Sequence, residues 1–214
     1  MTEYYIPTQP SKTEFTEKRS RFIGHVWPVS SEEEARAHIQ EIKTGYHDAR
    51  HHCWCYLLRE GGILRYSDDG EPQGTAGQPM LEMFRREQIE NVCCVVTRYF
   101  GGILLGTGGL VRAYVKSAQD ALDAAGVSVV RRWIQAEIRC PYAFLDRMKL
   151  TIEQNHGILG EILYTEEVQI PFLLLEEESP SFSQIISEQT AGRVSATLLG
   201  DVFRAVPRGS LRRD

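Results

Sequence analysis

The chain has 214 residues, is 42% hydrophobic and carries a formal net charge of −5 at pH 7. This charge excludes a broadly basic nucleic-acid-binding protein, so any contact with nucleic acid must use a local basic patch. No apolar run approaches the ~20 residues of a membrane-spanning helix, and the polar stretch 1–15 does not have the pattern of a signal peptide. The five Cys, an odd number, favour a reducing cytoplasm over a disulfide framework.

The first part of the chain alternates strand and helix patterns after a loosely structured lead-in at 1–17. Ser30 or Ser31 is a good N-cap for the first helix, and Gly45 ends it. Gly61 and Gly62 form the turn of a hairpin. The elements expected are strands at 20–29, 51–58, 63–66 and 91–98 and helices at 30–43, 79–87 and 110–125.

A second unit follows a connector at 127–133. Its expected elements are a strand at 133–141, a helix at 142–155, strands at 158–165 and 168–175, a helix at 180–190 and a strand at 193–204. This βαββαβ order is typical of a ferredoxin-like sandwich. The chain is therefore expected to be an α+β protein with an N-terminal domain at 1–128, a C-terminal domain at 129–206 and a tail at 207–214.

The tail contains VPRGS, which overlaps a common engineered protease site. For this reason Arg208, Arg212 and Arg213 are given no functional weight.

Two glycine-rich segments, SDDGEPQGTAGQPML at 67–81 and VVTRYFGGILLGTGGLVRAY at 95–114, hold eight of the 18 Gly. The second has a strand, a glycine-rich loop and a helix in that order, an arrangement that suits anion binding by free backbone N–H groups. The candidate anion-binding residues in it are Arg98, Gly101, Gly102, Thr107, Gly108 and Arg112. Equally, these glycines could serve only tight turns and close packing of a helix on a sheet.

The first segment carries three carboxylates, Asp68, Asp69 and Glu71. They could form an acidic cluster that holds Mg²⁺ through oxygen ligands. Asp-Gly and Glu-Pro are also ordinary turn sequences, in which Asp caps its own backbone. Since both interpretations, an acidic cluster and ordinary turns, are open, no metal site is assigned.

A run of His and Cys, HHCWCYLL at 51–58, offers ligand atoms on a predicted strand. Its spacing does not suit tetrahedral zinc, and nothing like a nucleophile turn accompanies it. A basic patch is the stronger candidate, because Arg21, Arg50 and His51 could join Lys18, Arg19 and Arg98 near aromatic residues. Such a surface suits RNA, although a solvated sheet edge would look the same in sequence.

Four stretches resemble the IMPACT family, in particular its bacterial YigZ group. They are KRSRFIGHV at 18–26, DARHHCWCY at 48–56, the first glycine-rich segment, and TRYFGGILLGTGGLVRAY at 97–114. The resemblance implies an N-terminal domain similar to a small-subunit ribosomal protein domain and to elongation factor G domain IV. It implies a C-terminal domain similar to elongation factor G domain V. It supplies no catalytic residues, and the Ser-rich phosphate loop of small-molecule kinases with a similar fold is absent.

These observations favour a cytoplasmic, non-enzymatic translation regulator that contacts RNA, the ribosome or a translation-associated protein. No cofactor and no membrane partner are expected. The alternative is a phosphate- or nucleotide-binding enzyme that uses the glycine-rich loop before the 110–125 helix. A protein-interaction module, as in the eukaryotic relatives, is a further possibility.

Overall fold

The computed structural model describes residues 3–208 and divides them into two compact units. The N-terminal unit spans Tyr4–Val129 together with residues 205–208, and the C-terminal unit spans Val130–Arg204. Residues 3–208 form two sheets and five α-helices, an α+β arrangement as predicted. Across these same residues, every helix is too short or too polar to cross a membrane. Of the tail, residues 209–214, with Arg212 and Arg213, lie outside the described part.

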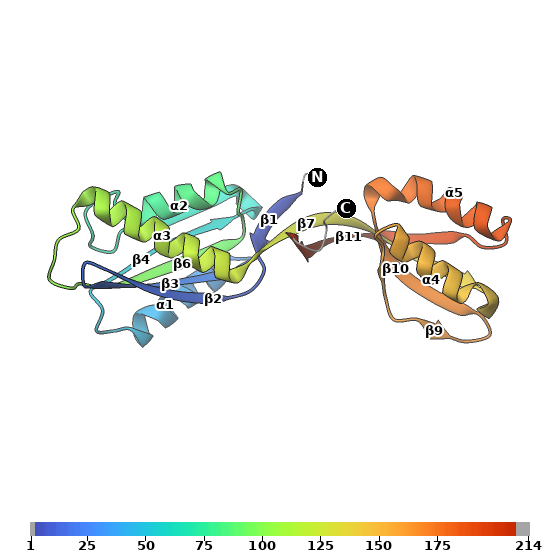
Figure 1. Cartoon of the computed structure of the whole chain (residues 1–214), viewed down its shortest axis with the longest axis horizontal. Helices are drawn as coiled ribbons and strands as arrows, with labels where there is room; N and C mark the ends of the chain where they lie inside the picture. The colour runs from blue at the N-terminus through green and yellow to red at the C-terminus, as the bar shows by residue number, and fades with distance from the viewer. Residues whose placement is uncertain (1–2, 209–214) are drawn as a thin grey trace. The chain divides into compact units, whose positions relative to one another are not determined.

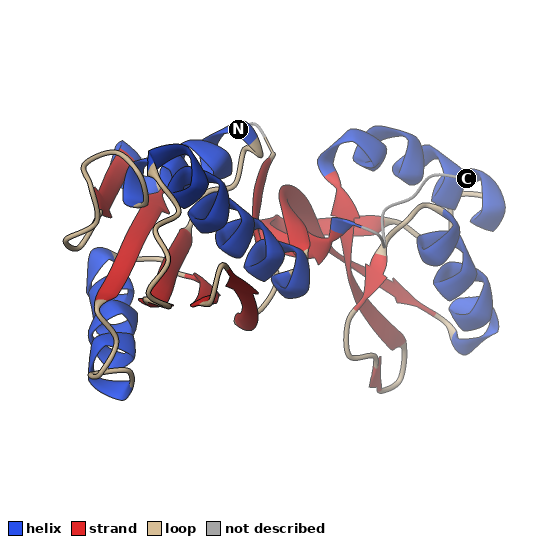
Figure 2. Ribbon diagram, turned by 60° about the vertical axis from the view of Figure 1, so that its left-hand side comes forward, coloured by secondary structure: helices blue, strands red, loops and turns tan. Residues whose placement is uncertain are grey.

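An antiparallel five-stranded sheet forms the centre of the N-terminal unit, in the order β2-β3-β6-β4-β5. Helix α1 covers one face of this sheet, and α2 and α3 cover the other (Figures 1 and 2). The elements are β1 (Tyr4–Pro7), β2 (Ser11–Glu17), β3 (Ser20–Pro28), α1 (Glu32–Gly45), β4 (His51–Leu58), a 3₁₀ turn (Glu60–Gly62), β5 (Ile63–Ser67), α2 (Gly77–Arg86), β6 (Val92–Tyr99) and α3 (Thr107–Ala125).

Coverage on both faces explains why the two inner strands are apolar almost without interruption. Six residues of β4 and seven of β6 are buried. Their side chains alternate between a core under α2 and α3, which contains Cys55 and Cys94, and a core under α1, which contains Cys93 and Val95. Helix α1 begins as predicted, because the Ser31 hydroxyl accepts a hydrogen bond from the Glu34 backbone N–H at 3.2 Å.

Three expectations about the elements were wrong. The expected loose lead-in at 1–17 is wrong for residues 3–17, most of which belong to β1 and β2, and residues 1–2 lie outside the described part. The sequence of β2, SKTEFTE, is polar except for Phe15 and does not show the apolar pattern of a strand. It is nevertheless an edge strand, whose residues alternate between half-buried and exposed. The expected connector at 127–133 is the first half of β7. The expected strand 158–165 is two short strands, β8 and β9.

The second sheet has the strand order β1-β7-β10-β8, with β11 also paired to β7 and β9 to β10. Two helices pack against this sheet through a core that contains Ile138, Met148, Phe172, Phe182 and Ile186. The elements are β7 (Val127–Cys140), a 3₁₀ turn (Tyr142–Phe144), α4 (Leu145–Gln154), β8 (Ile158–Leu159), β9 (Leu163–Tyr164), β10 (Val168–Leu175), a 3₁₀ turn (Glu176–Glu178), α5 (Ser179–Thr190) and β11 (Ala196–Pro207).

Gly24 sets the distance between α3 and the sheet. A Cβ atom there would lie 2.5 Å from the Ser117 carbonyl oxygen. We therefore expect Gly24→Ala to reduce the free energy of unfolding by about 1–3 kcal/mol, measured by urea denaturation. Gly45→Ala at the end of α1, where a Cβ atom meets nothing within 4 Å, is the control and should be neutral or slightly stabilising. Equal stability of the two variants would contradict this role of Gly24.

His25 is 6% exposed and stacks on Trp27, and burial lowers its pKa from 6.5 to about 4. Because the unfolded chain binds the proton first, the contribution of His25 is complete above pH 6.5 and is lost as the pH falls to about 4. We expect a loss of about 3 kcal/mol from this group over that range. The free energy of unfolding, measured by urea denaturation, should therefore fall less steeply between pH 6.5 and about 4 for His25→Phe than for the wild type. Parallel pH profiles would contradict this.

Candidate ligand-binding end of the N-terminal unit

The strand register brings the two glycine-rich segments and the basic residues near them to one end of the sheet. Arg21 at the start of β3 pairs with Tyr99 at the end of β6, and His51 at the start of β4 pairs with Arg98. We call this end of the unit the motif end. It consists of the β2–β3 turn (17–19), the chain before β4 (48–50), the loop before α2 (68–76), the loop before α3 (100–106) and the first turn of α3.

The two glycine-rich segments meet at this end through a buried ion pair. The Arg98 guanidinium lies 2.6 Å from the Glu71 carboxylate, and both side chains are at most 5% exposed. The Tyr114 hydroxyl from α3 donates to the same Glu71 oxygen at 2.8 Å. One carboxylate thus joins the loop before α2 to both β6 and α3.

Arg98, predicted as an anion-binding residue, is paired inside the unit and buried. Its guanidinium donates to Glu71 and to the Ser20 hydroxyl at 3.2 Å, and it lies over the rings of Phe22 and Phe100 at 5.5 and 5.4 Å. The residue is buried by this packing. Nothing local in the sequence shows that the partner of Arg98 is Glu71, which lies 27 positions earlier.

The three carboxylates of the first segment do not act together as a metal site. The Asp68 carboxylate accepts hydrogen bonds from the backbone N–H groups of Gly74, Ala76 and Gly77, at 2.8–3.0 Å. Asp68 therefore shapes the loop and caps the start of α2, so the turn reading of the sequence fits better. Within residues 3–208, no group of three or more His, Cys, Asp or Glu side chains is arranged to hold a metal ion.

Asp69 joins this loop to α1 and β4. Its carboxylate accepts from the Lys43 ammonium at 3.0 Å and from the His52 backbone N–H at 2.7 Å. Partial burial raises the pKa of Asp69, but these two donors outweigh it, so the pKa lies below its usual value. The His51 ring nitrogen Nδ1 is 2.9 Å from the Asp69 carbonyl oxygen. The half-buried His51 side chain thus contacts the loop before α2.

Gly101 shows that one glycine of the second segment is needed for packing. A Cβ atom there would lie 2.0 Å from the backbone carbon of Arg19. The Gly101 N–H also donates to the Ser20 hydroxyl at 3.2 Å. The loop before α3 is therefore held against the β2–β3 turn. Gly102, by contrast, has a positive φ of 84° and open space around it.

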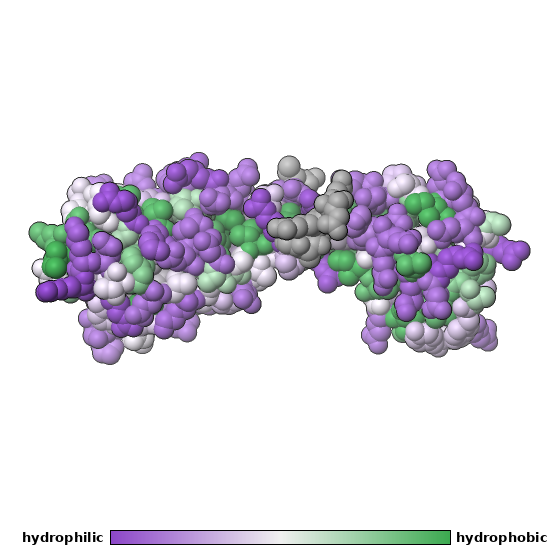
Figure 3. All heavy atoms as spheres, in the orientation of Figure 1, coloured by the Kyte–Doolittle hydropathy of each residue, from purple (hydrophilic) through white to green (hydrophobic). Residues whose placement is uncertain are grey.

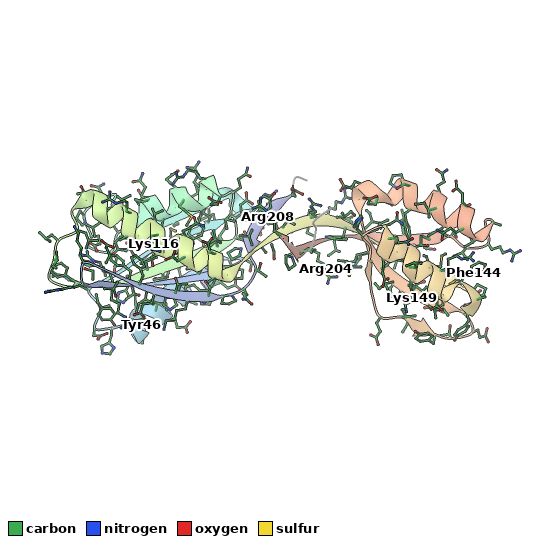
Figure 4. The ribbon with its side chains drawn as sticks, in the orientation of Figure 1. Tyr46, Lys116, Phe144, Lys149, Arg204 and Arg208 are labelled. Atoms are coloured by element: carbon green, nitrogen blue, oxygen red, sulfur yellow. The ribbon has the colours of Figure 1, made fainter. Side chains whose placement is uncertain are left out.

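The start of α3 remains open to a ligand. Gly106 is the N-cap and provides no side-chain hydrogen bond, and the first turn has no acidic residue. Thr107, Gly108 and Arg112 are exposed there. A cavity of about 160 Å³ beside this turn is lined by Lys18, Arg112, Lys116, Phe15, Glu17, Leu105, Gly109 and Ala113. Lys116, which Figure 4 labels on α3, lies over the Phe15 ring at 5.0 Å.

Four cations of the motif end have no ion-pair partner among residues 3–208: Lys18, Arg19, Arg50 and Arg112. All four are exposed. Arg21 differs, because it forms a double hydrogen bond with Glu14 at 2.6 and 2.7 Å and lies over the Tyr99 ring. The sequence indicated Lys18 and Arg19 through the KRSR motif, but not that Lys18 lines the same cavity as Arg112.

Comparisons with known proteins agree with this arrangement of motifs. The Impact N-terminal domain family matches residues 18–122, and a domain of unknown function, DUF1949, matches residues 138–193. The IMPACT family member YvyE of Bacillus subtilis is 38% identical over 191 residues, which cover 89% of this chain and 88% of the relative. The chain belongs to the IMPACT family. YigZ of Escherichia coli, another IMPACT family member, is 32% identical over 90% of this chain and 96% of its own length.

Eukaryotic and structural relatives extend the comparison. Protein IMPACT of Mus musculus is 29% identical over 47% of this chain and 33% of its own length. A crystal structure described as that of a hypothetical protein is 31% identical and covers 93% of this chain and 98% of its own, with a TM-score of 0.58. The two-unit fold of this IMPACT-family chain therefore has a solved counterpart.

The Glu71–Arg98 pair should be essential for stability because removal of Glu71 leaves a buried charge without a partner. We expect Glu71→Ala to lower the free energy of unfolding by about 3–5 kcal/mol in urea denaturation. The matched control is Glu14→Ala, which removes an exposed Arg21 pair of the same 2.6 Å length and should cost about 0–1 kcal/mol. The double variant Glu71→Leu/Arg98→Met should recover much of the loss. Similar losses in the two single variants would contradict the assignment.

Proposed function

We propose that this IMPACT-family chain binds RNA through the motif end and acts without catalysis, as a translation-associated protein. The observation that supports this most is the group of four exposed cations of the motif end, Lys18, Arg19, Arg50 and Arg112, for which residues 3–208 offer no ion-pair partner. Two of them, Lys18 and Arg112, line the cavity beside the open start of α3. Phosphates are the natural partners of such a group, because Lys and Arg contacts to the backbone supply most of the affinity of nucleic-acid binding. A local patch of this kind is what a chain of net charge −5 requires.

The buried network supports the proposal by its rigidity. Each of its three carboxylates has a partner within the unit. Glu71 pairs with Arg98, Asp68 accepts hydrogen bonds from backbone N–H groups, and Asp69 pairs with Lys43. These three carboxylates are thereby engaged within the unit, and they compete less with phosphates for the exposed cations of the motif end. A surface held in one conformation also loses less conformational entropy when it binds.

The family resemblance supplies the biological setting of the proposal. We propose that the N-terminal unit has the fold type of a small-subunit ribosomal protein domain and of elongation factor G domain IV. We propose likewise that the C-terminal unit is ferredoxin-like, as elongation factor G domain V is. A reducing cytoplasm suits the five Cys, all of which are buried and free.

The alternative, a phosphate- or nucleotide-binding enzyme, has less support. The cavity beside the first turn of α3 is about 160 Å³, whereas small-molecule sites usually measure roughly 300–1,000 Å³. Arg98, the strongest candidate for charge stabilisation in the second segment, is already paired with Glu71.

The proposal is tested by binding of a fluorescently labelled fragment of small-subunit ribosomal RNA across a salt series. We expect Lys18→Ala/Arg112→Ala to weaken binding at least about 10-fold at low salt and to reduce the slope of log K against log salt by about 1–2. Arg86→Ala is the control, since Arg86 is an exposed cation at the opposite end of α2. Absence of binding at low salt, or an equal loss in the control, would contradict the proposal.

A further inference from the structure

Three apolar side chains project from the motif end next to its cations. In the loop before α3, Phe100 is 41% exposed, Ile103 40% and Leu104 82%. We call these residues the apolar tip. Figure 3 shows apolar surface beside hydrophilic surface at this outer end of the N-terminal unit, on the left of the view. Single exposed apolar residues are common, but three within five positions of one loop, next to free cations, suggest an interaction surface.

The backbone that carries the apolar tip is held in place. Gly101 packs against the Arg19 backbone and donates to the Ser20 hydroxyl. The Phe100 ring lies 5.4 Å from the buried Arg98 guanidinium. The loop is therefore anchored against the β2–β3 turn at Gly101, next to Phe100. Ile103 and Leu104 follow in the same loop, and the next residue, Leu105, lines the cavity beside α3 together with Lys18.

We propose that the apolar tip contacts unpaired bases of the RNA bound at the motif end, so that the preferred partner is a single-stranded loop or bulge rather than a continuous duplex. The inference rests on the proposed function. The cations suit the phosphates of a polyanion, but phosphates make no favourable contact with the neighbouring apolar side chains. A continuous duplex hides the faces of its bases, whereas a loop or bulge offers them for stacking and apolar contact.

The apolar tip has side chains suited to this contact. Arg98 lies near one side of Phe100, and the exposed part of the ring is available to a base, in the manner of aromatic platforms in single-strand-binding proteins. Leu and Ile are among the side chains that proteins insert between bases. An anionic membrane fits less well, because a continuous plane of headgroups would also meet the exposed acids Glu17 and Asp48, whereas discrete phosphates can lie on the cations alone.

The test compares the affinity of the full chain for two labelled RNAs of equal length, a hairpin with a large unpaired loop and a fully paired duplex. We expect the wild type to prefer the hairpin by roughly 10-fold or more. Ile103→Ser/Leu104→Ser should reduce this preference to about 2-fold or less while its duplex affinity and salt slope stay unchanged. Leu198→Ser on β11, which removes a side chain that is 63% exposed in the C-terminal unit, is the matched control.

The outcomes separate the two proposals. Equal affinity of the wild type for both RNAs, or an unchanged preference in the tip variant, would overturn the role of the apolar tip. RNA binding that Lys18→Ala/Arg112→Ala weakens would still support the proposed function. Binding to phosphatidylserine vesicles that the tip variant abolishes, without a preference between the RNAs, would assign the tip to membranes instead. A wild type that binds neither RNA at low salt would overturn both proposals.

Discussion

The buried ion pair between Glu71 and Arg98 is the interaction on which the N-terminal unit depends. At 2.6 Å, with both side chains nearly excluded from solvent, it fixes the loop before α2 to the last residues of β6. Tyr114 adds α3 to the same carboxylate, and Ser20 adds the start of β3 to the same guanidinium. A buried charge tolerates little displacement of its partner, so these four segments keep one relative arrangement.

That arrangement determines what the outer surface presents. Glu71, Asp68 and Asp69 are hydrogen-bonded within the unit, whereas Lys18, Arg19, Arg50 and Arg112 are exposed at the motif end. Because Gly101 admits the Arg19 backbone at a distance that no side chain would allow, the loop before α3 lies directly against the β2–β3 turn. Beyond this contact the loop is mostly exposed, and Phe100, Ile103 and Leu104 present apolar side chains to solvent.

Regular elements with strong apolar patterns could be predicted from the sequence, and the site could be predicted only in part. The strand 51–58 and the capped first helix were correct because burial on both faces and the Ser31 cap leave clear local signals. The polar edge strand β2 and the first half of β7 were missed because neighbours, not their own residues, make them strands, whereas the second half of β7 was predicted as the strand 133–141. The burial of Arg98 and its pairing with Glu71 could not be predicted for the same reason, since the partner is distant in sequence. Arg112, Thr107 and Gly108 are exposed at the start of α3, where the glycine-rich loop indicated them.

The central claim is that the family motifs converge on one rigid end whose exposed side is an RNA surface. Ultraviolet cross-linking of RNA bound to the full chain, followed by mass-spectrometric mapping of the linked peptides, tests this most directly. The account predicts cross-links in the β2–β3 turn and in the loop before α3, at or near Lys18 and Phe100. Cross-links confined to the C-terminal unit, or to the opposite end of the N-terminal sheet around Gly61 and Arg86, would contradict it.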